Sequence, residues 1–184
     1  MVETVFEDDR MRLRTWRDDD VDTFAEMCAS AAVMQWLGGP IDREQTAAVI
    51  ARIMACHVEH GHCFWAVERK ADDALLGFCG IKRVNDPDAT NPGAFEIGWR
   101  LREDVWGQGY ARDGAVASLD LAFDRYGADR VCAFTVIENE GSWGLMERLG
   151  MRRAEALDFH STQPWVAAHN PVIAWDITRD QWRS

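Results

Sequence analysis

Hydrophobic positions along the chain follow two periods, and segments of the two kinds alternate. Residues 11–17 alternate apolar and basic side chains, which is typical of a half-buried strand. Short apolar runs bounded by turn residues predict further strands at residues 63–68, 75–84, 94–101, 130–137 and 171–178. Helical spacing predicts helices at residues 21–30, 42–60, 110–126 and 141–150. This order, β-α-α-β-β-β-α-β-α-β, predicts an α/β (α+β) chain around one mixed sheet.

Two predicted helices carry signals at their starts. Asp42 followed by Gln45 is a capping box, and Gly61 is expected to end the helix that it opens. The three aspartates at residues 18–20 precede another helix, where they would supply its cap and favour the positive end of its dipole. The buried face of the first of these helices is predicted to carry Ile50, Ile53, Met54 and Val58.

The composition is that of one globular domain, residues 1–184, and suggests a cytoplasmic protein. No apolar run approaches the roughly 20 residues that span a bilayer, and the acidic start MVETVFEDDR is unlike a signal peptide. Five cysteines without a CxxC pair indicate reduced thiols. A net charge of −11 argues against nucleic acid and anionic membranes as partners, and favours a cationic partner such as an amine, a polyamine or a basic protein.

Residues 105–115 (VWGQGYARDGA) place two glycines directly before a predicted helix. Such a turn presents free backbone N–H groups at the positive end of the helix dipole, an arrangement that binds phosphate or pyrophosphate. A tight turn without a ligand is the alternative, because the pattern alone is weakly specific. Known phosphate loops fit poorly: the GKS or GKT of a Walker loop is absent, and Arg112 stands where the dinucleotide fingerprint has glycine.

Longer motifs around this turn are more specific. FEIGWRLREDVWGQGYARDGA, followed by RVCAFTVIENEGSWGLMERLGM, resembles the GCN5-related N-acetyltransferase (GNAT) family, and more narrowly the branch of the ribosomal-protein N-terminal (alanine) acetyltransferases. The resemblance covers nearly the whole chain, from RLRTWRDDD through FWAVERKADDALLGFCGI to the last strand. It implies the acyl-CoA acyltransferase fold, a central mixed sheet splayed around the cofactor with helices on both sides. It also implies transfer of acetyl from acetyl-CoA, as co-substrate, to a primary amine.

The resemblance implies which residues hold acetyl-CoA. In the family, the amides of a turn R/Q-x-x-G-x-G/A bind the pyrophosphate; here the turn begins with Trp106, a departure that removes one polar contact and leaves the amides in place. A backbone N–H around Trp99 is expected to meet the developing oxyanion. The expected cofactor-binding residues are Trp99, Leu101, Gln108, Gly109, Tyr110, Ala111, Arg112 and Asn139.

Glu96 and Ser142 are the expected catalytic residues. Alternation along the strand places Glu96 on the face opposite Phe95 and Ile97. A carboxylate there can take the proton that an ammonium must lose before its nitrogen attacks a thioester, although solvent exposure on an outer face would also explain it. Family members often have a glutamate at this place. Ser142 is the candidate acid for the departing thiolate, because its segment has no tyrosine; positioning, or a plain helix-capping role shared with Asn139, is the alternative.

Trp36 and His160 are the expected acceptor-binding residues, in a helix-turn segment and in the loop before the last strand; for that loop, a plain surface role is equally compatible with the sequence. The segment CHVEHGHC at residues 56–63 gathers histidines and cysteines, but its spacing differs from that of zinc sites, so no metal is expected. The acceptor is expected to be the N-terminal amine of a ribosomal or other protein, with two rivals: a polyamine or aminoglycoside, and an acyl-CoA-binding domain without turnover. The protein is expected to be a monomer or homodimer.

Overall fold

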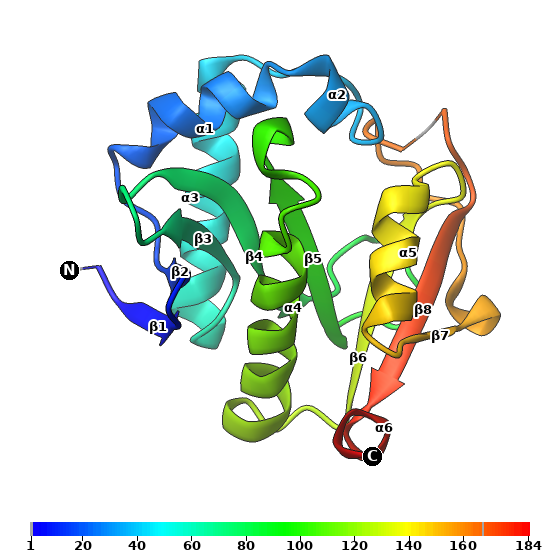
Figure 1. The fold of residues 1–184 in the computed structure, drawn as a ribbon. Coiled ribbons are helices and arrows are strands. Elements are labelled where there is room, and N and C mark those ends of the chain that lie inside the picture. Colours follow the sequence, from blue (N-terminus) through cyan, green and yellow to red (C-terminus); the bar gives the residue numbers. More distant parts are fainter. Residues whose placement is uncertain (1, 167) are drawn as a thin grey trace.

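The structure, a computed structural model, describes residues 2–166 and 168–184. One mixed sheet has the strand order β1-β2-β3-β4-β5-β6-β8-β7 (Figure 1). The strands are β1 (Thr4–Glu7), β2 (Met11–Arg14), β3 (Phe64–Arg69), β4 (Leu75–Arg83), β5 (Phe95–Leu101), β6 (Arg130–Val136), β7 (Arg152–Arg153) and β8 (Val172–Thr178). Neighbouring strands pair antiparallel, except that β5 and β6 run parallel. The predicted mixed sheet is confirmed, with β1 and β7 as additions to it.

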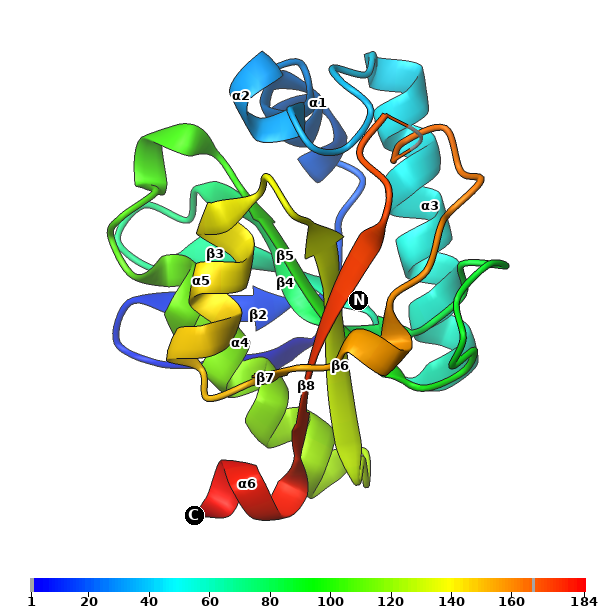
Figure 2. The same cartoon turned by 90° about the vertical axis from the view of Figure 1, so that its right-hand side faces the viewer.

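Helices cover both faces of the sheet (Figure 2). On one face, α1 and α3 pack through an apolar cluster that contains Phe24, Ile50 and Phe78. On the other face, Ala115 of α4 and Leu145 of α5 belong to the main core. The helices are α1 (Asp20–Cys28), α2 (Ala31–Met34), α3 (Arg43–His60), α4 (Tyr110–Asp120), α5 (Glu140–Arg148) and α6 (Arg179–Arg183). Across the described residues, none of these helices has the length and apolar character needed to cross a membrane.

The predicted end signals of α3 and α4 act as expected. Asp42 accepts a hydrogen bond from the backbone N–H of Gln45 at 2.8 Å, and Gln45 Oε1 accepts one from the backbone N–H of Asp42 at 2.9 Å. Gly61 ends α3 in the left-handed region. The helix predicted at residues 110–126 begins at Tyr110 as α4 and continues as a π-helical turn, Leu121–Arg125.

The predicted buried face of α3 is partly wrong. Thr46, Ile50 and Ile53 form a narrow buried stripe along the helix. Met54 and Val58 do not extend it: both are exposed, Val58 to 85%. With about 3.6 residues per turn, Val58 lies roughly a third of a turn from Thr46 around the helix axis, so it faces away from the sheet.

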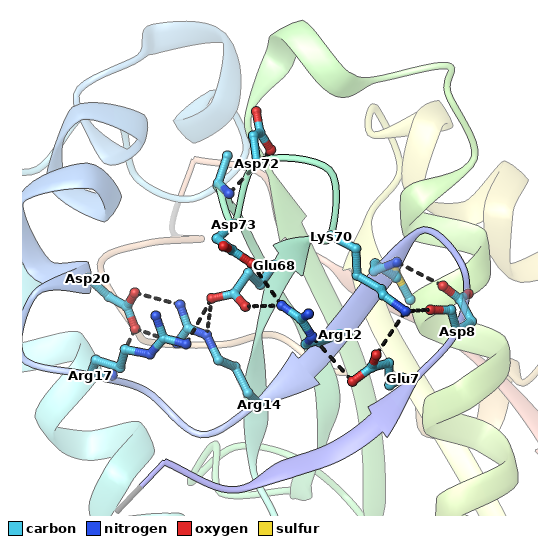
Figure 3. A network of polar contacts seen from close by, with 12 residues as sticks. Glu7, Asp8, Arg12, Arg14, Arg17, Asp20, Glu68, Lys70, Asp72 and Asp73 are labelled. Atoms are coloured by element: carbon cyan, nitrogen blue, oxygen red, sulfur yellow. Dashed lines mark hydrogen bonds and ion pairs between the residues drawn. The ribbon is translucent and has the colours of Figure 1, made fainter.

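Buried ion pairs join β2 and β3 to α1 (Figure 3). Arg14 of β2 donates to both carboxylate oxygens of Asp20 at 2.8 Å and to Glu68 of β3 at 2.7 Å, and all three side chains are buried. Arg12 and Arg17 also approach Glu68. The expected side-chain cap at the start of α1 is absent among the described residues. Asp20 instead ties the helix start to β2, because a buried arginine needs a carboxylate partner.

The sheet opens between β5 and β6. Among the described residues their backbones pair at two adjacent positions, the second being Glu96 with Cys132. Beyond that pair, β5 stays paired with β4 as far as Leu101, and β6 stays paired with β8 as far as Val136. The two halves of the sheet therefore diverge in the strand direction and leave an opening that widens toward the ends of β5 and β6 (Figure 1).

Candidate functional site

Glu96 lies at the closed end of this opening, in the last pair that joins β5 to β6. Its neighbours Phe95 and Ile97 belong to the core on the α4 side of the sheet. Because side chains alternate along a strand, Glu96 points to the opposite face, which α1 and α3 cover. The alternation predicted for this strand is confirmed.

The carboxylate of Glu96 is paired with a lysine from the neighbouring strand. Lys82 Nζ lies 2.8 Å from Glu96 Oε2, and the side chains are 19% and 16% exposed. The same ammonium donates to Asn85 Oδ1 at 2.7 Å. The pair sits face to face because Lys82 and Glu96 are direct cross-strand partners in β4 and β5.

Burial raises the pKa of Glu96 above that of an exposed glutamate, and the nearby charge of Asp86 adds to this, while Lys82 acts in the lowering direction. The net effect is a carboxylate that binds a proton more readily than a glutamate in water. A raised pKa brings a carboxyl group closer to neutral pH, where a general base works best. The environment of Glu96 therefore suits proton transfer.

At the open end, the loop after β5 enters α4 with backbone amides that have no acceptor in the part of the chain that the structure describes. Gly109 is the residue before the helix, has a φ of 91°, and provides no side-chain cap. Gly107 has a φ of 74°, and a side chain added there would meet nothing within 4 Å among the described residues. The first N–H groups of a helix have no acceptor within it, so the amides of residues 109–112 can bind an anion.

The side chains around this loop are used within the protein. Gln108 donates to the carbonyl of Asp104 at 2.9 Å, and the exposed indole of Trp106 donates to the carbonyl of Leu101 at 2.8 Å. Trp99 and Leu101 lie on the open stretch of β5, with their side chains packed in the core on the α4 side. What these residues can offer a ligand is mainly their backbone.

Asn139 and Ser142 come together at the start of α5. Asn139 Oδ1 accepts a hydrogen bond from the backbone N–H of Ser142 at 3.3 Å, which is the helix-capping role. The half-buried hydroxyl of Ser142 has no hydrogen-bond partner within the described part of the chain. Capping therefore uses one oxygen of Asn139 and leaves the Ser142 hydroxyl available to a ligand.

Glu96 and Ser142 stand at different ends of the opening. Cys132 is opposite Glu96, and Val136 ends β6 shortly before α5 begins. These four residue steps correspond to about 13 Å along β6. Because β5 and β6 are parallel, Ser142 and the loop before α4 both follow the ends of their strands at the same edge of the sheet, whereas Glu96 lies at the closed end.

Trp36 lies against the end of β6 and the start of β8. It packs on an apolar cluster with Val136, Phe159 and Val172, and its ring meets the His169 ring edge-on at 5.1 Å between centroids. His160 follows Phe159 and is exposed. The structure therefore brings the Trp36 segment against the loop that carries His160, although the two predicted side chains differ in burial.

Two residues near the site were missed in the sequence. Lys82 could have been found by writing the two strands of the β4–β5 hairpin side by side, since it is the cross-strand partner of Glu96. Arg10, whose guanidinium donates to the carbonyl of Gln108 at 2.7 Å, carries no such signal, because 98 residues separate the two.

The cysteine- and histidine-rich segment at residues 56–63 packs against the sheet. The pKa of Cys56 falls to about 7, chiefly through a hydrogen bond with Cys63. His62 is buried beside the carbonyl of Ile81, and burial lowers its pKa. Within the described residues, no group of three or more histidine, cysteine or acidic side chains is placed to hold a metal ion.

Comparison with known proteins gives the family. Residues 10–152 match the acetyltransferase (GNAT) domain. YnaD of Bacillus subtilis, an uncharacterized N-acetyltransferase, is 36% identical over 145 residues, which are 78% of this chain and 80% of YnaD. The FsC-acetyl coenzyme A-N(2)-transacetylase of Aspergillus fumigatus is 30% identical over 151 residues, covering 79% of this chain and 63% of that protein.

A solved structure shows the same fold. RimL, a ribosomal L7/L12 alpha-N-protein acetyltransferase determined in complex with coenzyme A, superposes with a TM-score of 0.76 at 15% identity, covering 97% of this chain and 99% of RimL. At that identity the likeness concerns the fold alone, whereas the domain match extends over most of the chain. The chain therefore belongs to the GNAT family of acetyltransferases, enzymes that use acetyl-CoA as acyl donor.

Proposed function

We propose that the protein transfers acetyl from acetyl-CoA to the nitrogen of a primary amine, in the opening between β5 and β6. The observation that carries this proposal is the arrangement of the two ends of that opening. Helix amides at residues 109–112, which have no acceptor among the described residues, lie at one end, and the partly buried carboxylate of Glu96 lies at the other. A long ligand with an anionic head and a reactive tail fits such a site end to end.

The residues present fit acetyl-CoA. The amides from Gln108 to Arg112 would hold its pyrophosphate, because Gly107 faces open space and Gly109 adds no side chain of its own beside the Arg10 guanidinium. The open stretch of β5 at Trp99 and Leu101 would lie along its arm, and Asn139 would face it from α5. When bound, acetyl-CoA supplies an activated thioester carbonyl.

Three groups of the protein would then act on protons and charge. Glu96 takes the proton of the acceptor ammonium through water. A backbone N–H around Trp99 stabilises the oxyanion. Ser142 donates a hydrogen bond or a proton to the departing thiolate. Its hydroxyl, which has no hydrogen-bond partner among the described residues, supports that role, and the separation of about 13 Å along β6 means that Glu96 would receive the amine proton through water.

The acceptor is a primary amine that arrives as a cation. The net charge of −11 attracts such a molecule, and the face around Glu96 adds the carboxylate of Asp86. Trp36 and His160 would contact the acceptor. We place the N-terminal amine of a protein first, since RimL shares the fold and is named for that activity. A small amine is the second candidate, supported by the 30% identical transacetylase, whose name specifies an N(2) position.

The test is release of free coenzyme A thiol in steady state, with acetyl-CoA and a panel of acceptors. The panel contains peptides with free N-termini, N-blocked copies of the same peptides, polyamines and aminoglycosides. Turnover with free but not blocked peptides supports the protein acceptor, and turnover with small amines alone supports the second candidate.

Thermal unfolding tests whether the protein binds acetyl-CoA, and together with the turnover assay it distinguishes an enzyme from a domain that only binds acetyl-CoA. Acetyl-CoA at 100 times its Kd should stabilise the fold by about 2.7 kcal/mol, and NAD should have no effect. Stabilisation by acetyl-CoA without turnover on any amine would favour a binding domain, and stabilisation by NAD alone would contradict the acetyl-CoA site.

A further inference from the structure

Arg10, in the turn between β1 and β2, contacts the loop that precedes α4. Its guanidinium donates to the carbonyl of Gln108 at 2.7 Å and to Asp113 Oδ2 at 2.6 Å, and it lies 4.4 Å from the centre of the Tyr110 ring. The turn that carries it is held by Asp8, which accepts from the backbone N–H groups of residues 10 and 11. An arginine from the start of the chain is thus fixed over the start of α4.

Asp113 is an acid in the first turn of α4, close to the unpaired amides. A carboxylate in that turn can accept hydrogen bonds from the N–H groups of its own helix, and the helix dipole favours it there. Its Oδ2 lies 3.9 Å from the position that a side chain on Gly109 would occupy. The Asp113 carboxylate can therefore compete with an anionic ligand for the backbone N–H groups of residues 109–112.

The Arg10–Asp113 ion pair removes that competition. Both side chains are partly exposed, at 45% and 28%, so the pair itself contributes little to folding. The effect of the pair is to fix the position of the carboxylate. Asp113 Oδ2 accepts a hydrogen bond from the Arg10 guanidinium, which the carbonyl of Gln108 orients. In the same arrangement, the N–H groups of residues 109–112 have no acceptor among the described residues.

We propose that Arg10 is a positioning residue that keeps the Asp113 carboxylate off the helix amides and thereby sets the affinity for acetyl-CoA. The inference rests on the proposed acetyl-CoA site. Without Arg10, the carboxylate rotates onto the free N–H groups and adds a negative charge where the pyrophosphate must bind. Arg10 acts on binding through Asp113 and takes no part in proton transfer.

The test is a calorimetric titration of coenzyme A into the wild type, Arg10→Met, Asp113→Asn and the double variant, which gives a Kd for each. Arg10→Met should raise the Kd about tenfold or more, since a hydrogen bond with a charged partner is worth roughly that factor. Asp113→Asn should bind as tightly as the wild type or more tightly. The double variant should recover most of the affinity lost in Arg10→Met, because the competitor is gone.

Kinetics and a matched control complete the experiment. In Arg10→Met the KM for acetyl-CoA should rise while kcat at saturation stays near the wild-type value. Arg43→Met is the control, because Arg43 forms an exposed pair with Asp22 on α3 and α1, away from the loop; it should leave both constants unchanged.

Two results would overturn this inference. Equal affinity of Arg10→Met and wild type would show that Arg10 does not affect binding. A double variant as weak as Arg10→Met would show that Arg10 acts on the ligand or the loop by itself, and not through Asp113. Failure of the wild-type protein to bind coenzyme A would instead contradict the proposed function.

Discussion

At the scale of single residues, the partner of Glu96 matters as much as Glu96 itself. Burial raises the pKa of this carboxyl group, and Lys82 at 2.8 Å counteracts the effect. A base must be deprotonated to act, so kcat/KM should rise with pH through the raised pKa of Glu96. The two residues together set where that rise occurs.

Lys82→Met should therefore move the acidic limb of the pH profile to higher pH, because it removes the group that lowers the pKa of Glu96. Glu96→Gln should lower kcat/KM by about 10²-fold or more near neutrality, with a loss that shrinks at high pH, where the amine is already deprotonated. Both are measured as pH profiles of kcat/KM with the best acceptor.

Lys70→Met is the matched control for Lys82→Met. Lys70 is the other lysine of the chain, and it also lies 2.8 Å from a glutamate, Glu7, on the N-terminal strands. Its removal should leave the profile in place. A wild-type profile in both Lys82→Met and Glu96→Gln would mean that the base lies elsewhere.

Ser142→Ala should lower kcat at every pH, because departure of the thiolate needs help after the amine has attacked. Stability should change little, since the hydroxyl has no partner among the described residues. Ser118→Ala is the opposite case: its buried hydroxyl donates to the carbonyl of Gly114 at 2.7 Å, so it should cost about 1 kcal/mol of stability and leave kcat unchanged. An unchanged kcat in Ser142→Ala would show that Ser142 has no catalytic role and is only part of the start of α5.

Candidate catalytic residues could be predicted from the sequence where the neighbouring residues alone make them unusual. Glu96 stands out as a carboxylate in an apolar strand, and Ser142 as a hydroxyl at a helix start. Lys82 and Arg10 could not be selected in this way, because their roles arise from strand register and from a contact across 103 residues of chain to Asp113. The roles of Glu96 and Ser142 stay predictions, whereas the strand face of Glu96 is confirmed.

At the scale of elements, the ends of α3 are predictable because their signals are local, whereas the side-chain cap predicted at the start of α1 is absent among the described residues. The capping box and Gly61 place both ends of α3 correctly. β1 was missed because its two apolar residues, Val5 and Phe6, are adjacent and do not alternate, and β7 because two residues cannot show a period. The π-helical turn after α4 was missed as well, because the apolar spacing of an α-helix and a π turn is similar over five residues.

The element before α4 allows a comparison of two glycines. Gly109 precedes α4 with a φ of 91°, and Gly61 follows α3 with a φ of 73°. Of the two, only Gly109 lies in the proposed acetyl-CoA site. Valine at either position should cost about 1–3 kcal/mol through backbone strain. Gly109→Val should also weaken acetyl-CoA binding at least tenfold in calorimetric titration of folded protein, while Gly61→Val should not. Equal affinities would mean that Gly109 serves the turn alone.

At the scale of the whole molecule, sequence patterns predicted one mixed sheet but neither its strand order nor its opening. Both depend on pairing between segments far apart, such as β6 with β8. The buried ion cluster of Arg14, Asp20 and Glu68 has the same origin, because it gathers side chains from β2, α1 and β3. Long-range pairing of this kind leaves no periodic signal along the chain.

That cluster should control the stability of the N-terminal half of the sheet. Glu68→Gln should destabilise the protein by about 3–5 kcal/mol in denaturant unfolding, because it leaves the buried charge of Arg14 partly unpaired. Asp73→Asn is the control: Asp73 also pairs with Arg12, but its side chain is 70% exposed, so less than about 1 kcal/mol is expected. Similar small losses in both variants would show that the cluster adds no more than a surface pair.

The opening between β5 and β6 also has a consequence for how copies of this chain behave together. Residues 97–101 and 133–136 each leave one backbone edge, on the side of the other strand, that no strand of the described residues pairs with. Edge strands are templates for pairing with another chain, and most proteins cover or interrupt them. Here bound acetyl-CoA would lie between the two edges and cover them. Ligand-free protein should then be the form that self-associates on concentration, and acetyl-CoA should act as a solubilising agent as well as a reactant.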